Sequence, residues 1–244
     1  MLKPFSFSLV LLASSAGVCM AQPSSKVLVA VDGSYQAPED PFRSSAAKIL
    51  NAEEETFDAD YKVGGAAGLE IGASVRVWRA LAVGVLVSRT SGVGSAKVTG
   101  RLPHPLYFDR FRTTSGEVGG LKRRSTIVGL QVGAVLGFRA RGQVLLYAGP
   151  AFVAVQQPVV EDFTYTDAYP YDAASFERAT TAPARDSAMG FQVGGDVGFF
   201  FSRHAGLGFC AQFARAKIHL RAGGETIALN AGGPRAAAGL RVRF

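Results

Sequence analysis

The sequence predicts an all-β fold, an antiparallel up-and-down barrel of eight strands, and two observations lead to it. Apolar residues alternate with small or polar residues in eight segments, and the connections between these segments are alternately short and long. The candidate strands are 26–35, 64–78, 81–93, 121–138, 142–156, 187–202, 205–220 and 234–244. The short connections are Trp78-Arg79-Ala80, Arg139-Ala140-Arg141 and Ser202-Arg203-His204, and the long ones are 36–63, 94–120, 157–186 and 221–233. This order is typical of a barrel with both termini and all short turns at one end.

Three of the candidate strands alternate clearly. In 64–78, the odd positions from 69 to 77 are apolar, and the even positions facing them are Gly, Glu, Ser and Arg. In 121–138, the even positions from 130 to 138 are apolar, and in 187–202 the odd positions from 191 to 201 are mostly Phe and Val. The first strand is short and 142–156 is apolar on both faces, so their phases stay open.

The distribution of charge indicates which side of the barrel is apolar. The outer surface of a barrel in water should be roughly a quarter to a third Lys, Arg, Asp and Glu. Segments 125–138 and 142–156 contain no charged residue, and 187–202 contains only Asp196. We therefore expect the apolar face to contact lipid and the other face to line a narrow lumen. Aromatic residues at the turn ends of the strands match the girdle of such a barrel: Trp78, Phe138, Phe199, Phe201 and Phe244.

The first residues predict export. Lys3 precedes a mostly apolar stretch of signal-peptide length, and Ala21 is a small residue of the kind that signal peptidases prefer. We expect residues 1–21 to be a cleaved signal peptide and residues 22–244 to form one barrel domain. A lipoprotein signal at Cys19 is the alternative.

The C-terminal strand has the features of an assembly signal. Leu240, Val242 and Phe244 share one face, and the strand ends in an aromatic residue. With this ending and this architecture, the chain over 26–244 resembles small bacterial outer-membrane β-barrels, such as OmpX and the transmembrane domain of OmpA. The resemblance implies a bacterial outer-membrane location, contact with outer-membrane lipid and lipopolysaccharide, and recognition of the last strand by the barrel assembly machinery. It also implies a monomer without a cofactor. OmpA-type proteins have a peptidoglycan-binding domain after the barrel, and that role is not carried over.

Four charged residues are expected to point into the lumen. By their phase these are Glu70, Arg76, Asp196 and Arg241. An eight-stranded barrel is just wide enough for side chains to fill it, and unpaired buried charges are costly. The four residues should therefore pair as a buried network. That network could be structural filling, or it could gate a narrow passive channel for ions or small solutes.

The long connections hold the remaining candidate contacts. Aromatic and His side chains gather in the second and third of them, with basic residues in the second and acidic residues in the third. The two could cap the barrel by packing on each other, or they could bind a partner. Lys122-Arg123-Arg124 is expected to meet lipopolysaccharide phosphates, and Glu53-Glu54-Glu55 to be solvated. The candidate loop contacts are His104, Tyr107, Phe108, Phe111, Tyr165, Tyr169 and Tyr171.

No pattern predicts a catalytic, metal or cofactor site. His104, His204 and His219 have no Ser at the spacing of lipid-deacylating barrels, and no His, Cys or carboxylate cluster has ligand spacing. The net charge of +7 comes from no long basic block, so nucleic acid is not an expected partner. The sequence thus favours a structural or surface-interaction role. A narrow channel is the alternative, and a lipid-modifying enzyme using His219 is a weaker third. A ten-stranded barrel, with a hairpin formed from part of 94–120, stays open.

Overall fold

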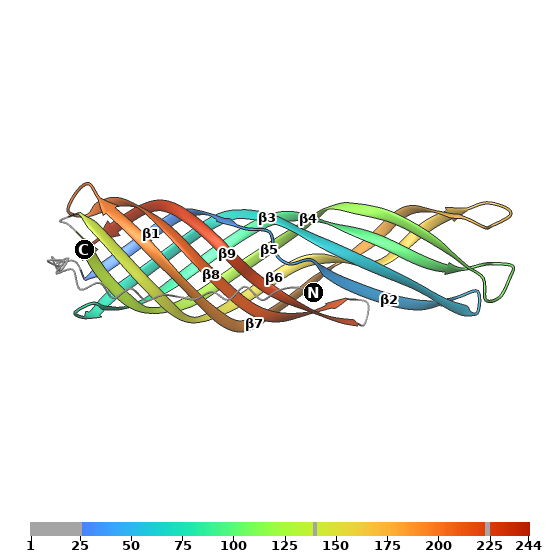
Figure 1. The fold of residues 1–244 in the computed structure, drawn as a ribbon, viewed down its shortest axis with the longest axis horizontal. Coiled ribbons are helices and arrows are strands. Elements are labelled where there is room, and N and C mark those ends of the chain that lie inside the picture. Colours follow the sequence, from blue (N-terminus) through green and yellow to red (C-terminus); the bar gives the residue numbers. More distant parts are fainter. Residues whose placement is uncertain (1–25, 139–140, 223–224) are drawn as a thin grey trace, which may run out of the picture.

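The computed structural model describes residues 26–138, 141–222 and 225–244, which form an elongated antiparallel barrel (Figure 1). The expected signal peptide, together with Arg139 and Ala140 of an expected turn, lies outside these residues. No helix in the described part of the chain is long and apolar enough to cross a membrane. The strands are β1 (Val27–Gln36), β2 (Phe42–Leu50), β3 (Glu53–Trp78), β4 (Leu81–Pro103), β5 (Phe111–Phe138), β6 (Gly142–Asp167), β7 (Ala174–Phe200), β8 (Ala205–Ala222) and β9 (Glu225–Arg243).

The nine strands occupy eight positions around the barrel. Their order is β1-β9-β8-β7-β6-β5-β4-β3-β2, and the pairing of β1 with β3 closes the ring. β1 pairs with 66–75 of β3 and β2 pairs with 53–61, so β1 and β2 share one position. The prediction of an eight-stranded barrel is confirmed. The ten-stranded alternative is wrong, because 94–103 and 111–120 lengthen β4 and β5 instead of adding a hairpin.

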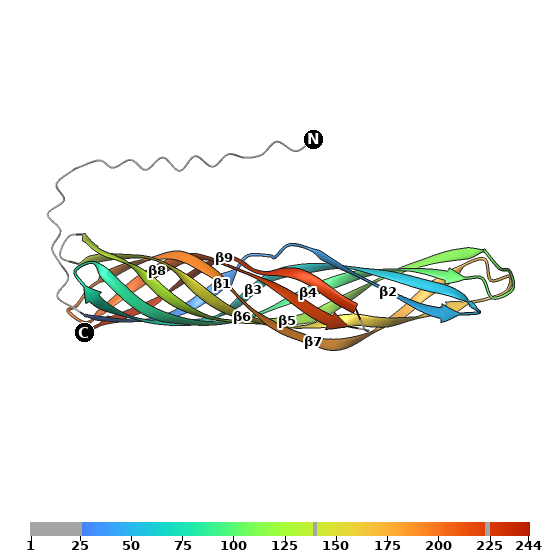
Figure 2. The ribbon, with the colours of Figure 1, turned by 90° about the horizontal axis from the view of Figure 1, so that it is seen from below.

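The two ends of the barrel differ. The turn end carries the connections 79–80 and 201–204 and the C-terminal residue Phe244. The loop end carries 51–52, 104–110 and 168–173. In both views the β8–β9 hairpin ends part-way along the molecule, while β2 to β7 continue toward the loop end (Figure 1, Figure 2).

The half of the barrel near the turn end is apolar outside and polar inside. On β3, Leu69, Ile71 and Val75 are exposed, while Glu70 and Ser74 are buried. Strand β7 follows the same pattern, with exposed Phe and Val on one face and buried Gln192 and Asp196 on the other. The girdle residues Trp78, Phe138, Phe199, Phe201 and Phe244 are all exposed at or near the turn end. This inside-out distribution is the one typical of a barrel surrounded by lipid.

The other half, here called the distal extension, consists of β2, the loop-end parts of β3 to β7 and the end of the β8–β9 hairpin. Strands run through most of 36–63, 94–120, 157–186 and 221–233, so the prediction of long loops there is wrong. In the extension the alternation is inverted: Phe57, Ala59 and Tyr61 are buried, and Asp58 and Asp60 lie on the outer side. On β3 the inversion coincides with a register irregularity between Val63 and Ala66. Strands in water need an apolar interior, which explains the reversal.

The distal extension is closed by side-chain packing more than by backbone pairing. β5 and β6 are paired only as far as Arg124 and Gln156, and beyond this fork the β6–β7 hairpin packs across the sheet. Gly100 and Gly116 make room for it, because a Cβ atom there would overlap the rings of Phe163 and Phe176. Part of the resulting core is Tyr61, Val98, Leu102, Val159, Ile218, Leu220 and Leu229.

Candidate functional site: the filled lumen and the distal tip

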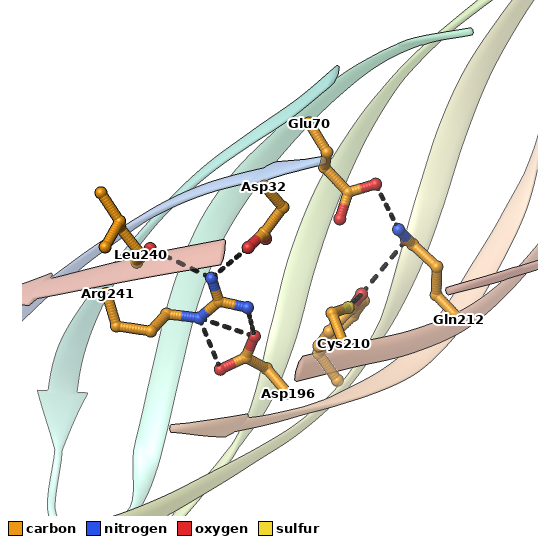
Figure 3. A network of polar contacts seen from close by, with 8 residues as sticks. Asp32, Glu70, Asp196, Cys210, Gln212, Leu240 and Arg241 are labelled. Carbon is orange, nitrogen blue, oxygen red and sulfur yellow. Dashed lines mark hydrogen bonds and ion pairs between the residues drawn. The ribbon is translucent and has the colours of Figure 1, made fainter. Parts of the chain in front are cut away.

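An arginine between two carboxylates lies in the lumen near the turn end. The Arg241 Nε atom donates to Asp196 at 2.9 Å, a second nitrogen pairs with the same carboxylate, and a third pairs with Asp32 (Figure 3). Arg241 has no exposed surface. Gly208 on β8 gives the guanidinium its space, since a Cβ atom there would lie 2.6 Å from Arg241 Nε. Three strands, β1, β7 and β9, are thereby tied together inside the barrel.

A second polar layer lies next to the first, toward the loop end. Gln212 donates to Glu70 (Figure 3). It also accepts a hydrogen bond from the Tyr147 hydroxyl at 3.2 Å. Arg235 lies 3.7 Å from Glu70 and also contacts Ser88. Between the first two layers is a cavity of only about 30 Å³, about the volume of one water molecule.

A third layer separates the polar lumen from the apolar core of the distal extension. Arg123 pairs with Glu39, which lies between β1 and β2, and donates to Gln157 at 2.8 Å. Gln36 donates to Glu39 and to the carbonyl of Gly232 at 3.1 Å. Arg123 therefore points inward, and its expected contact with lipopolysaccharide phosphates is wrong.

The sequence located part of this network. Glu70, Asp196 and Arg241 are buried where their phases placed them, whereas Arg76 is half-buried and lies closer to the turn end. Two further members of the network, Asp32 and Arg235, are not among the residues that the sequence predicts for the lumen. Arg235 shares its phase with Arg241 and could have been found by continuing the last strand backward. Asp32 lies on the first strand, whose phase the sequence left open.

The last strand lies between two neighbours. β9 pairs with β8 on one side and with β1 on the other, and Leu240, Val242 and Phe244 share its outward face. Leu240 and Phe244 are exposed, and Val242 is half-buried. Arg241 lies on the opposite face of the strand, which points into the lumen.

At the loop end, the connection 104–110 folds around a buried histidine. The His104 Nδ1 atom accepts a hydrogen bond from the Leu106 backbone N–H at 3.1 Å, and the His104 N–H donates to the carbonyl of Arg110 at 2.8 Å. The Tyr107 ring lies over His104, with ring centres 5.0 Å apart. Leu106, Tyr107 and Phe108 are left exposed, Phe108 by 77%.

Ion pairs hold the connection 168–173 beside this loop. Arg112 pairs with Asp167 and donates to the carbonyl of Tyr171 at 3.1 Å, and Arg110 pairs with Asp172 at 2.7 Å. Two of the candidate aromatics are covered by arginines: Phe111 by Arg101 and Tyr165 by Arg112. Tyr169 is 82% exposed. The exposed residues Leu106, Tyr107, Phe108 and Tyr169 are called the distal tip below.

Comparison with known proteins adds evidence on the fold. No protein-family model and no curated protein matches the sequence. The crystal structure of the outer membrane protein OprG from Pseudomonas aeruginosa is similar, with a TM-score of 0.51 and 10% identity over 90% of this chain and 96% of that one. The chain has the fold of a small outer-membrane β-barrel. The crystal structure of Neisserial surface protein A has a lower TM-score of 0.46, with 10% identity over 89% of this chain and 97% of that one. The crystal structure of Ail from Yersinia pestis has a TM-score of 0.38, with 8% identity over 90% of this chain and 99% of that one.

The histidines of the barrel are dispersed. His104 is buried at the loop end, His219 is exposed on β8, and His204 lies in a turn, where its Nδ1 atom is 3.1 Å from the Arg243 carbonyl oxygen. Asp186 accepts a hydrogen bond from the backbone N–H of His219, not from its ring. Within 26–138, 141–222 and 225–244, no three His, Cys, Asp or Glu side chains are grouped to hold a metal ion.

In 36–63, the first of the expected long connections, the position of Glu55 differs from the prediction. Glu55 was expected in a solvated acidic run, but it is 1% exposed and lies 3.6 Å from Lys48. Lys48 also contacts Asp162 of β6 at 2.7 Å. Burial raises the pKa of the Glu55 carboxyl above its ordinary value, and Lys48 opposes this shift. The pair therefore holds β2 and β3 against β6 in the distal extension.

Proposed function

We propose that this chain is an integral protein of a bacterial outer membrane that presents the distal tip to an external partner. The outward apolar face supports the location. Along β7 and the residue that follows it, this face runs from Met189 to Phe201, twelve residue steps or roughly 40 Å of chain, which at a tilt of about 40° spans about 30 Å. Charged residues cover the outside beyond this band. The turn end is then periplasmic and the loop end extracellular.

The observation that carries the surface role is the exposure of the distal tip. Large aromatic side chains exposed together on a folded surface are characteristic of contact sites, since they bury much area at little cost in conformational entropy. At this tip, Phe108 and Tyr169 come from two loops, and the ion pair between Arg110 and Asp172 joins these loops. The two loops therefore present their exposed aromatic side chains at the same end of the barrel.

The filled interior favours this role over a channel. A permeating ion would have to pass the Arg241 layer, the Glu70 layer and the Arg123 layer, and then the apolar core of the distal extension. The charges in the lumen are best understood as structural filling that ties the strands together.

The test is retention of bacteria that display the barrel on their surface. Cells producing the wild-type protein or the variant F108S/Y169S would be passed over beads coated with alkyl chains, a fibrous protein or a sulfated polysaccharide. We expect the wild type to be retained on at least one coating. Because a single hot-spot aromatic is worth about 2 kcal/mol, or about thirtyfold in affinity, the variant should lose at least about thirtyfold in binding, read as a loss of retention.

The control for this test is E117Q, an exposed position on β5 outside the tip. Surface levels of all three proteins are compared by their heat-modifiable migration. Equal retention of wild type, F108S/Y169S and E117Q on every coating would refute the surface role while leaving the outer-membrane location standing.

A further inference from the structure

A groove lined by arginines opens on the outer wall at the fork between β5 and β6. It has a volume of about 470 Å³, and Arg89, Arg124 and Arg185 border it together with Thr126, Gln156 and Ser187. In the sheet, Arg124 pairs with Gln156, and Gln156 pairs with Arg185. The two arginines thus flank Gln156 from either side, with Cα atoms about 10 Å apart at the usual strand spacing. Arg89 lies on β4 and pairs with Thr126 of β5. Thr126 is two residues from Arg124 along β5.

These three guanidinium groups are not used by the fold. In the part of the chain that the structure describes, none of them makes a hydrogen bond, an ion pair or a ring contact. The one carboxylate that borders the groove, Asp186, is engaged by the backbone N–H of His219 at 2.8 Å. Three unpartnered arginines around one groove create a positive site that a planar or tetrahedral oxyanion can satisfy.

The groove lies at the edge of the apolar band. On the four strands that form it, the first exposed apolar residues toward the turn end are Val87, Val128, Phe152 and Met189. Arg89 is two residues beyond Val87, and Arg124 and Arg185 are each four residues beyond Val128 and Met189. At about 3.3 Å per residue the arginines are within about 7–13 Å of strand from the band, at the depth of lipid head groups.

We propose that this groove, formed by Arg89, Arg124 and Arg185, binds a phosphate group of a phosphorylated glycolipid in the outer leaflet, with the acyl chains against Val128 and Phe152. The proposal rests on the outer-membrane location given above. A lipid satisfies both halves of the surface, because its phosphate meets the arginines while its chains cover the apolar wall directly below. Free phosphate would satisfy only the first. Gln156, Thr126 and Ser187 can donate further hydrogen bonds to the phosphate oxygens.

The experiment is native mass spectrometry of the full mature chain, folded in a non-ionic detergent and titrated with bisphosphorylated lipid A. The same lipid without phosphates, phosphatidylglycerol and inorganic phosphate are titrated in parallel. We expect the phosphorylated lipid A to bind at least about tenfold more tightly than its dephosphorylated form, since charge-assisted hydrogen bonds are lost with the phosphates. The variant R124Q/R185Q should bind phosphorylated lipid A about tenfold more weakly and dephosphorylated lipid A unchanged.

The matched control is K97Q/R178Q, which removes two exposed charges of β4 and β7 away from the groove. Equal loss in both double variants, or binding that ignores the phosphates, overturns the site. If inorganic phosphate binds as tightly as lipid A, the lipid site is refuted and the groove is a site for free phosphate. If phosphatidylglycerol binds as tightly as lipid A, the preference for a glycolipid is refuted. If R124Q/R185Q does not fold, R89Q is used and should weaken lipid A binding severalfold.

Two further readouts separate this site from the proposed function. The tip variant F108S/Y169S should bind lipid A like the wild type. A protein that shows no heat-modifiable band in detergent would refute the outer-membrane barrel itself, whereas a folded barrel with phosphate-independent lipid binding refutes only the groove.

Discussion

At the scale of single residues, the most demanding group is the guanidinium of Arg241. Removing such a charge from water costs several kcal/mol, and the cost is offset only when its partners are well placed. Asp196 and Asp32 supply two carboxylates to one cation, so the local charge is negative. Removing the arginine would leave both carboxylates buried together, which is worse than removing either carboxylate alone.

The substitution R241M should therefore lower the free energy of unfolding by about 3–5 kcal/mol, measured by urea titration of the folded barrel in detergent micelles. The triple variant R241M/D32N/D196N should recover most of this loss, because no buried charge remains in the layer. R203M, in the exposed turn 201–204, should stay within about 0.5 kcal/mol of the wild type. A loss under about 1 kcal/mol for R241M would contradict the buried network.

At the scale of strands, the sequence predicted the lipid-facing half well and the distal extension poorly. The apolar positions of β3 and β7 near the turn end stand out because their neighbours are small and uncharged. In 53–63 the same period of two is present, but Phe57, Ala59 and Tyr61 alternate with charged residues, so the stretch resembles a polar loop. Its phase is also shifted by the irregularity between Val63 and Ala66, where Gly64 and Gly65 are the only sequence signal of a bulge.

The packing of the β6–β7 hairpin across the sheet can be tested at Gly116. A Cβ atom there would lie about 2 Å from the Phe176 ring, so G116V must displace that ring from the core. Overpacking of this kind costs typically about 1–3 kcal/mol. We expect faster hydrogen exchange throughout 159–185 and faster proteolysis at 168–173, with unchanged heat-modifiable migration.

The matched control for this prediction is G119A. No atom lies within 4 Å of a Cβ added at Gly119, so this variant should exchange like the wild type. If G116V and G119A behaved alike, the hairpin would not be held by Phe176, and the distal extension would be a looser structure than its buried core indicates.

At the scale of the whole molecule, the interior of the barrel changes once along its length, from polar to apolar. It is polar beside the apolar outer band and apolar beside the charged outer surface, so each half has the interior that its surroundings require. The sequence predicted the first half of this rule from Glu70, Asp196 and Arg241. It could not predict the distal tip as a single surface, because the contacts of Arg110 and Arg112 join loops more than fifty residues apart.

A barrel filled over its whole length should not conduct. In planar lipid bilayers we expect the wild-type protein to give no discrete current steps at voltages where an open porin, inserted as a control, conducts steadily. D196N should be equally silent, because neutralising one carboxylate leaves the Glu70 and Arg123 layers and the apolar core in place. Discrete steps whose size changes with D196N would mean that ions pass Asp196, and the passive channel would then replace structural filling as the role of the lumen charges.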